Sequence, residues 1–151
     1  MMIAYPDTSF LCAMFRNQAN SPEAAKHFAQ MPEALHIASP LIFEFRQSTR
    51  WQAFLHANDP QKGFDRKTAQ AALAKFNSNI ACGAIVVVPV DWADVVSIGE
   101  RLSAQYTWTK GYRGFDVLHV ATAMHLGATE FLSFDGKQKD LAEAEGLMVR
   151  L

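Results

Sequence analysis

Short apolar runs alternate with amphipathic stretches along the chain, and this alternation predicts strands separated by helices. The clearest strand is Ala84-Ile-Val-Val-Val88, because apolar, mostly β-branched residues without a polar break are typical of a parallel strand covered on both faces. Shorter runs of the same kind predict further strands at residues 2–5, 35–38, 130–133 and 147–150.

Cap residues followed by proline, and apolar positions three to four residues apart, indicate where the helices lie. Ser39-Pro40 supplies a cap and a first-turn proline, and Leu41 and Phe45 then fall on one face of a helix that runs to about residue 55. Ser21 is expected to cap a helix at residues 22–30 in the same way. Further helices are expected at residues 8–16, 66–79, 92–105, 115–126 and 137–144, with loops at 59–63 and 106–114.

This order of elements predicts an α/β fold, namely a three-layer α/β/α sandwich with a mainly parallel central sheet. At 151 residues the chain is expected to form a single domain, 1–151. Ligands of open α/β sheets bind beyond the carboxyl ends of the strands, so a functional site is expected at that edge.

Composition narrows the function classes. Fourteen Lys and Arg against fifteen Asp and Glu exclude a polybasic binder, and an apolar fraction of 50% excludes disorder. The longest apolar run, residues 81–90, is too short for a membrane span, and no positively charged leader precedes the first strand. Cys12 and Cys82 lie in apolar surroundings and are predicted to be buried and unpaired, which favours a cytoplasmic protein.

Two acids follow predicted strands. Asp7 comes directly after the first strand, and Asp135 follows Phe131-Leu-Ser-Phe134. Each alone is explained by a helix cap or a turn. Together they would place two carboxylates at one edge of a parallel sheet, where like charges repel unless a counter-charge is present.

Two further acids lie in apolar helices. Glu44 and Asp116 are flanked by apolar residues, although acids near the start of a helix also interact favourably with its dipole. A buried carboxylate must be protonated, paired or bound to a metal. Arg46 and Arg113 could pair with one or two of the four acids. Hard divalent cations such as Mg²⁺ are the natural partners of the others.

The motifs Asp7-Thr-Ser-Phe-Leu, Glu44 after Ser39-Pro40-Leu, Arg113-Gly-Phe-Asp116 and Leu132-Ser-Phe-Asp135 occur in this order over almost the whole chain. They resemble PIN-domain ribonucleases, and in particular the VapC-type toxins of bacterial toxin–antitoxin pairs. Two departures stand out: Pro6 precedes the first acid, so the strand is expected to end or bulge there, and residues 56–79 are long for a compact toxin.

The resemblance implies an endoribonuclease that depends on Mg²⁺ or Mn²⁺, with a metal-activated water and an acidic quartet formed by Asp7, Glu44, Asp116 and Asp135. It implies that small residues, here Ser9 and Ser133, shape the site. It also implies RNA as substrate, a homodimer, and a small antitoxin protein as partner.

Several residues are candidates for contacts with RNA. Trp108 and Tyr112 are suited to stacking on bases, and Lys110, Arg113 and Arg46 to holding phosphates. The alternative is that the aromatic residues anchor their loop to the core and that Arg113 pairs with an acid. His119 is expected to support the site by hydrogen bonding. No histidine or cysteine pair has the spacing of a zinc site.

Two other functions remain open on the sequence. The chain could be a non-catalytic PIN-fold module that binds RNA or a partner. It could also be a phosphotransfer domain with Asp7 as phosphoryl acceptor, although Asp7-Thr-Ser lacks the second acid of a D-x-D arrangement.

Overall fold

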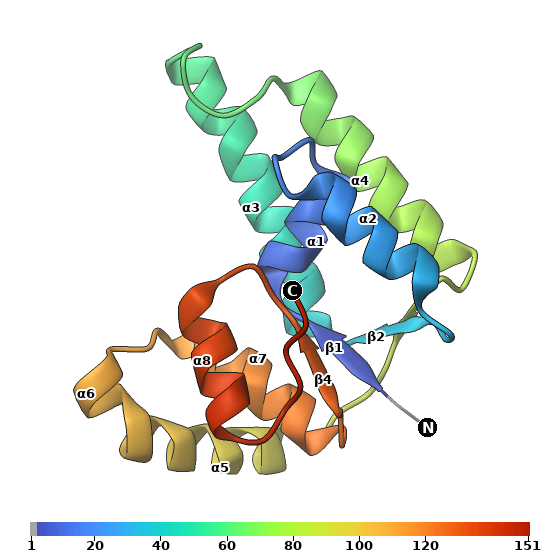
Figure 1. Cartoon of the computed structure of the whole chain (residues 1–151). Coiled ribbons are helices and arrows are strands. Elements are labelled where there is room, and N and C mark those ends of the chain that lie inside the picture. The colour runs from blue at the N-terminus through green and yellow to red at the C-terminus, as the bar shows by residue number, and fades with distance from the viewer. Residues whose placement is uncertain (1–2) are drawn as a thin grey trace.

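The structure is a computed structural model that describes residues 3–151 (Figure 1). Its strands form two parallel pairs: β1 with β4, in which Tyr5 lies opposite Phe131, and β2 with β3. β1 and β2 lie side by side, so the four strands form one central layer (Figure 1). The bounds are Ala4–Pro6 for β1, Leu35–Ile37 for β2, Ile85–Val87 for β3 and Glu130–Leu132 for β4. Met2, which the sequence places in the first strand, lies outside the described residues.

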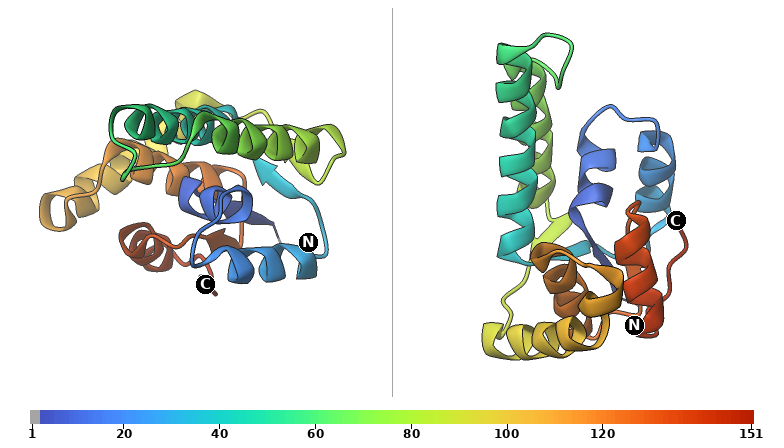
Figure 2. Two further views of the ribbon diagram at one scale, coloured as in Figure 1. Left: turned by 90° about the horizontal axis from the view of Figure 1, so that it is seen from above. Right: turned by 90° about the vertical axis from the view of Figure 1, so that its left-hand side faces the viewer.

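Helices cover both sides of the strands, as expected for a three-layer sandwich. In two perpendicular views, α2 and α8 lie on one side and α3, α4 and α5 on the other (Figure 2). The bounds are Thr8–Phe15 for α1, Ser21–Gln30 for α2, Ser39–Asn58 for α3, Arg66–Ala81 for α4, Trp92–Leu102 for α5, Gly114–His125 for α7 and Gly136–Ala144 for α8. Among residues 3–151, none of the helices has the length and apolar character that crossing a bilayer requires.

The antiparallel pair α3–α4 extends away from the rest of the molecule (Figures 1 and 2). Three buried rings attach its base to α1: the Phe45 and Phe76 ring centroids are 4.6 Å apart, and Phe15 lies 5.4 Å from Phe76. The stretch 56–79, noted above as long, forms the tip of this hairpin and most of α4.

Two predictions about burial are wrong. β3 is not covered on both faces, since Val86 and Val87 are 37% and 40% exposed; within residues 3–151 the strand pairs with β2 alone. Cys12 is buried as predicted, but Cys82 is exposed because it caps the carboxyl end of α4. Both thiols are free.

Two predicted caps are also wrong. α2 begins at Ser21 itself, and Asn20 is the cap; the Ser21 hydroxyl instead donates to the Arg16 carbonyl at 2.7 Å. α3 likewise begins at Ser39, one residue earlier than a capping serine would allow.

The predicted loop 106–114 is largely helical. α5 continues into a π-helical turn, η1 (Ser103–Thr107), and a short helix, α6 (Trp108–Lys110), which ends at Gly111 with a left-handed φ of 68°. The predicted last strand, 147–150, is reduced to a single parallel bridge between Met148 and Glu130.

Candidate active site

Asp7 lies where β1 ends and α1 begins. Pro6 pairs in register with Leu132, and the Asp7 amide donates to the Leu132 carbonyl at 3.0 Å, so the strand ends at the proline without a bulge. The Asp7 carboxylate is fully buried and caps α1 by accepting the Phe10 amide at 3.0 Å. Burial raises the pKa of Asp7, while hydrogen bonds from serine hydroxyls oppose the shift.

Those hydroxyls belong to Ser9 and Ser133. The Ser9 hydroxyl donates to Asp7 Oδ1 at 2.6 Å, and the Ser133 hydroxyl to Oδ2 at 2.5 Å. The Ser9 hydroxyl also accepts a hydrogen bond from the Phe134 amide at 2.8 Å, and the Ser133 hydroxyl accepts one from the Asp135 amide at 2.9 Å. Both amides belong to the segment after β4. The two serines therefore fix the segment that carries Asp135 against Asp7.

Asp135 caps α8, accepting the amides of Lys137 at 2.9 Å and Gln138 at 3.1 Å on Oδ1. The Gln138 side chain, from the same turn, donates to Asp116 Oδ1 at 3.2 Å. The sequence analysis missed Gln138. The available signal was a polar residue three positions after a helix cap, which is too common to single it out.

Asp116 lies in the first turn of α7. Its pKa is raised, first by burial and then by the negative charges of Asp135 and Glu44, while His119 and Arg113 act in the opposite direction. Asp116 therefore lies within electrostatic reach of two of the other predicted acids. This mutual repulsion is the property expected of a site that attracts a cation.

Glu44 lies near the start of α3 and forms a short contact with α7: its Oε2 is 2.5 Å from His119 Nε2. The His119 side chain is buried, and its ring packs against Phe115 with centroids 6.0 Å apart. His119 thus fixes one oxygen of Glu44, in keeping with the supporting role expected for it.

None of the four acids forms an ion pair with a lysine or arginine among residues 3–151, although Glu44 contacts His119. The ion pairs that lysine and arginine form there go to Asp59, Glu130 and Glu145. Arg46, considered above as a counter-charge, donates instead to Asn77 at 2.7 Å and lies over the Phe76 ring. Within this part of the chain, no lysine or arginine therefore neutralises the four carboxylates.

Comparison with known proteins identifies the family of this chain. The family model for the PIN domain matches residues 4–144. The chain belongs to the PIN domain family. PIN domains are generally nucleases.

Two solved structures share the fold over nearly the whole chain. The Mycobacterium tuberculosis toxin VapC20, described as cleaving the sarcin–ricin loop, is 20% identical, covers 98% of this chain and 99% of its own, and has a TM-score of 0.61. FitAcB from Neisseria gonorrhoeae is 15% identical and has a TM-score of 0.62; the match covers 99% of this chain and 97% of the FitAcB chain. No curated protein matches in sequence.

The donors of this PIN domain suit a hard divalent cation. Asp116 Oδ2, Asp135 Oδ2 and Glu44 Oε1 form no hydrogen bond within residues 3–151, and carboxylate oxygens are the ligands that Mg²⁺ prefers. In the same part of the chain, no three acidic, histidine or cysteine side chains already lie close enough to hold a metal. The residue types fit the ion, and binding it requires side-chain rotation.

The predicted RNA contacts divide into two groups. Trp108, at the end of the π-helical turn, is 89% exposed, and Lys110 and Arg113 are also exposed. Tyr112 is buried in the core, so it anchors its segment and is not available for stacking. Arg46 is engaged within the α3–α4 hairpin, as described above.

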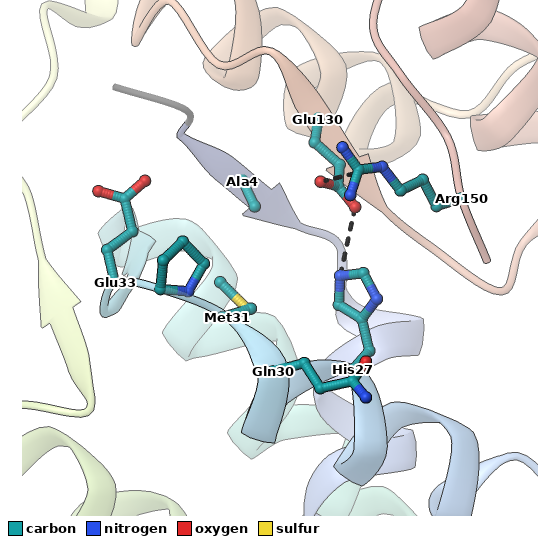
Figure 3. Close-up of a pocket in the computed structure, with 8 residues that line it drawn as sticks. Ala4, His27, Gln30, Met31, Glu33, Glu130 and Arg150 are labelled. Atoms are coloured by element: carbon teal, nitrogen blue, oxygen red, sulfur yellow. Dashed lines mark ion pairs between the residues drawn. The ribbon is translucent and has the colours of Figure 1, made fainter.

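A second polar pocket shows how this chain neutralises an acid elsewhere. A cavity of about 350 Å³ lies at the opposite, amino-terminal edge of β1 and β4 (Figure 3). In it the buried Glu130 carboxylate lies 3.2 Å from His27 Nε2 and 3.8 Å from Arg150 Nε. At the carboxyl edge, no lysine or arginine within residues 3–151 forms an ion pair with an acid as Arg150 does here, although His119 contacts Glu44 as His27 contacts Glu130.

Proposed function

We propose that this PIN domain is an endoribonuclease that depends on Mg²⁺ or Mn²⁺ and acts as the toxin of a toxin–antitoxin pair. The observation that carries the proposal is the group of carboxylates at the carboxyl edge of the sheet, with which no lysine or arginine within residues 3–151 forms an ion pair. Membership of the PIN family supports nuclease chemistry, and the likeness of fold to a toxin described as cleaving the sarcin–ricin loop supports RNA as substrate.

In this mechanism Asp116, Asp135 and Glu44 hold the ion with the carboxylate oxygens that form no internal hydrogen bond. The bound ion would lower the pKa of water and offset the charge of a phosphodiester. Asp7, the fourth acid of the group, is fully buried, and its bonds to Ser9 and Ser133 keep β1 and the α8 segment in register. His119 orients Glu44.

Substrate and partner contacts follow from the exposed residues near α7. Trp108 is suited to stacking on an unpaired base, and Lys110 and Arg113 to pairing with phosphates. We also propose that the protein forms a homodimer and binds a small antitoxin protein, on the basis of the resemblance to VapC-type toxins.

The experiment that tests the proposal is cleavage of total RNA by purified protein with Mn²⁺ and, separately, with EDTA. Asp116→Asn should abolish cleavage, because it removes a charge from the group that would hold the ion. Asp140→Asn is the matched control, since Asp140 is an exposed acid of α8 outside this group. Equal cleavage by wild type and Asp116→Asn, or cleavage that persists in EDTA, would refute the mechanism.

One observation favours a second function. Because no three metal-ligating side chains within residues 3–151 are already placed for a metal, a PIN-fold module that binds RNA without cutting it remains a candidate. Calorimetry separates the two: the module predicts RNA binding without Mn²⁺ binding, whereas the nuclease predicts both.

A further inference from the structure

Gln138 contacts two of the four acids at once. It lies in the first turn of α8 and is only 5% exposed. Its backbone amide donates to Asp135 Oδ1 at 3.1 Å, and its side-chain Nε2 donates to Asp116 Oδ1 at 3.2 Å. One residue therefore joins two acids that are 19 positions apart in the sequence.

The other end of this amide is unsatisfied. Gln138 Oε1 is buried and has no hydrogen-bond partner among residues 3–151. The orientation of the amide is determined by Asp116, because rotating the amide would place Oε1 against a carboxylate oxygen, and two acceptors repel. Buried acceptors in folded proteins are nearly always paired, so this one indicates a donor that reaches it when the neighbouring carboxylates rotate to hold an ion.

We propose that Gln138 positions Asp116 for a divalent ion and that its Oε1 accepts a hydrogen bond from water carried by that ion. This inference rests on the proposed function, because it requires the acids to bind Mg²⁺ or Mn²⁺. Such ions keep several of their waters in protein sites, and each water is a donor. Gln138 is thus a positioning residue, distinct from the carboxylates themselves.

A neutral amide suits this role better than a basic side chain. A lysine or arginine at position 138 would also hold Asp116, but it would cancel the negative charge that attracts a cation. Gln138 restrains the carboxylate and leaves its charge in place. The contrast with Glu130, which lies beside His27 and Arg150, supports this distinction within the same chain.

The test is Gln138→Met, which keeps the size of the side chain and removes both hydrogen-bonding groups. Calorimetric titration of the metal-free protein with Mn²⁺ should show affinity about 10-fold weaker than in wild type, as for other groups that orient metal ligands. In RNA cleavage, the Mn²⁺ concentration for half-maximal rate should rise by a similar factor, and the rate at saturating Mn²⁺ should stay within about 2-fold. Gln70→Met, an exposed glutamine of α4, is the control and should change neither.

Three outcomes overturn the proposal. Wild-type Mn²⁺ affinity in Gln138→Met shows that the residue does not act on the ion. A lower melting temperature with unchanged affinity shows a purely structural role. If wild type itself binds no Mn²⁺ and cuts no RNA, the proposed function fails first and Gln138 has no ion to act on. If Gln138→Met does not fold, Gln138→Asn, which keeps the amide but shortens its reach to Asp116, takes its place with the same expected loss of affinity.

Discussion

Asp7 carries two roles that conflict energetically. As the cap of α1 it must accept the Phe10 amide, and as a member of the acidic group it must remain ionised in a fully buried position. Ser9 and Ser133 supply hydrogen bonds that favour the charged form, but burial outweighs them and the pKa is raised. Asparagine is an equally good helix cap and carries no charge.

We therefore predict that Asp7→Asn abolishes cleavage and yet stabilises the metal-free protein. The pKa of Asp7 is higher in the native state than in the unfolded state, where it is about 3.9. Between these two values the native state still holds the proton that the unfolded state has lost. The free energy of unfolding of the wild type therefore falls as the pH rises from about 3.9 towards the native pKa. The two proteins should be similar at pH 4, and the variant should be more stable at pH 7 by on the order of 1 kcal/mol. Urea denaturation in EDTA at several pH values measures this difference. A variant less stable than wild type at every pH contradicts the prediction.

At the scale of elements, the sequence identified the strands and the acids that follow them. Apolar runs of three or four residues bounded by Asp7 or Asp135 are local signals, and the structure places strands there within one or two residues. Segments that depend on distant contacts were not predicted. Residues 106–110, predicted as loop, continue as helix where Tyr106 donates to Glu145 at 2.7 Å, and the Gln138–Asp116 bond joins two helices. Neither contact has a local signature.

The α3–α4 hairpin gives a prediction at this scale. Phe76 is buried against Phe45 and Phe15 at the base of the hairpin, so Phe76→Ala should lower the free energy of unfolding by about 3–5 kcal/mol. Phe54 lies on α3 nearer the tip and is 55% exposed, so Phe54→Ala should change the free energy of unfolding by less than about 1 kcal/mol. Chemical denaturation of both variants gives the comparison. Similar losses in both would mean that the tip is as tightly packed as the base.

For the whole molecule, the two edges of the parallel strands differ in how their acids are compensated. At the amino-terminal edge Glu130 lies beside His27 and Arg150 (Figure 3), whereas at the carboxyl edge the charges of Asp135 and Glu44 raise the pKa of Asp116, and no lysine or arginine within residues 3–151 forms an ion pair with these acids. Sequence position alone could not reveal this difference, because the partners of Glu130 come from α2 and the carboxyl-terminal segment. Folding therefore concentrates acids that form no ion pair with lysine or arginine at one edge of the described chain.

That concentration predicts how Mn²⁺ and pH act together on stability. Burial and neighbouring charges raise the pKa of Asp116, so the metal-free protein gains stability from this group as pH falls, because the native state binds its proton more readily than the unfolded chain. Mn²⁺ binds the deprotonated carboxylates, so the ion should stabilise the protein more at pH 7 than at pH 5, where protons compete for the same oxygens. At 100 times the dissociation constant the gain is about 2.7 kcal/mol, which corresponds to roughly 5–10 °C in melting temperature for a chain of this length. Asp116→Asn should lose most of the shift at pH 7, and Asp140→Asn should keep it. A Mn²⁺-induced shift that is the same at both pH values, or that survives in Asp116→Asn, would place the ion outside the acidic group.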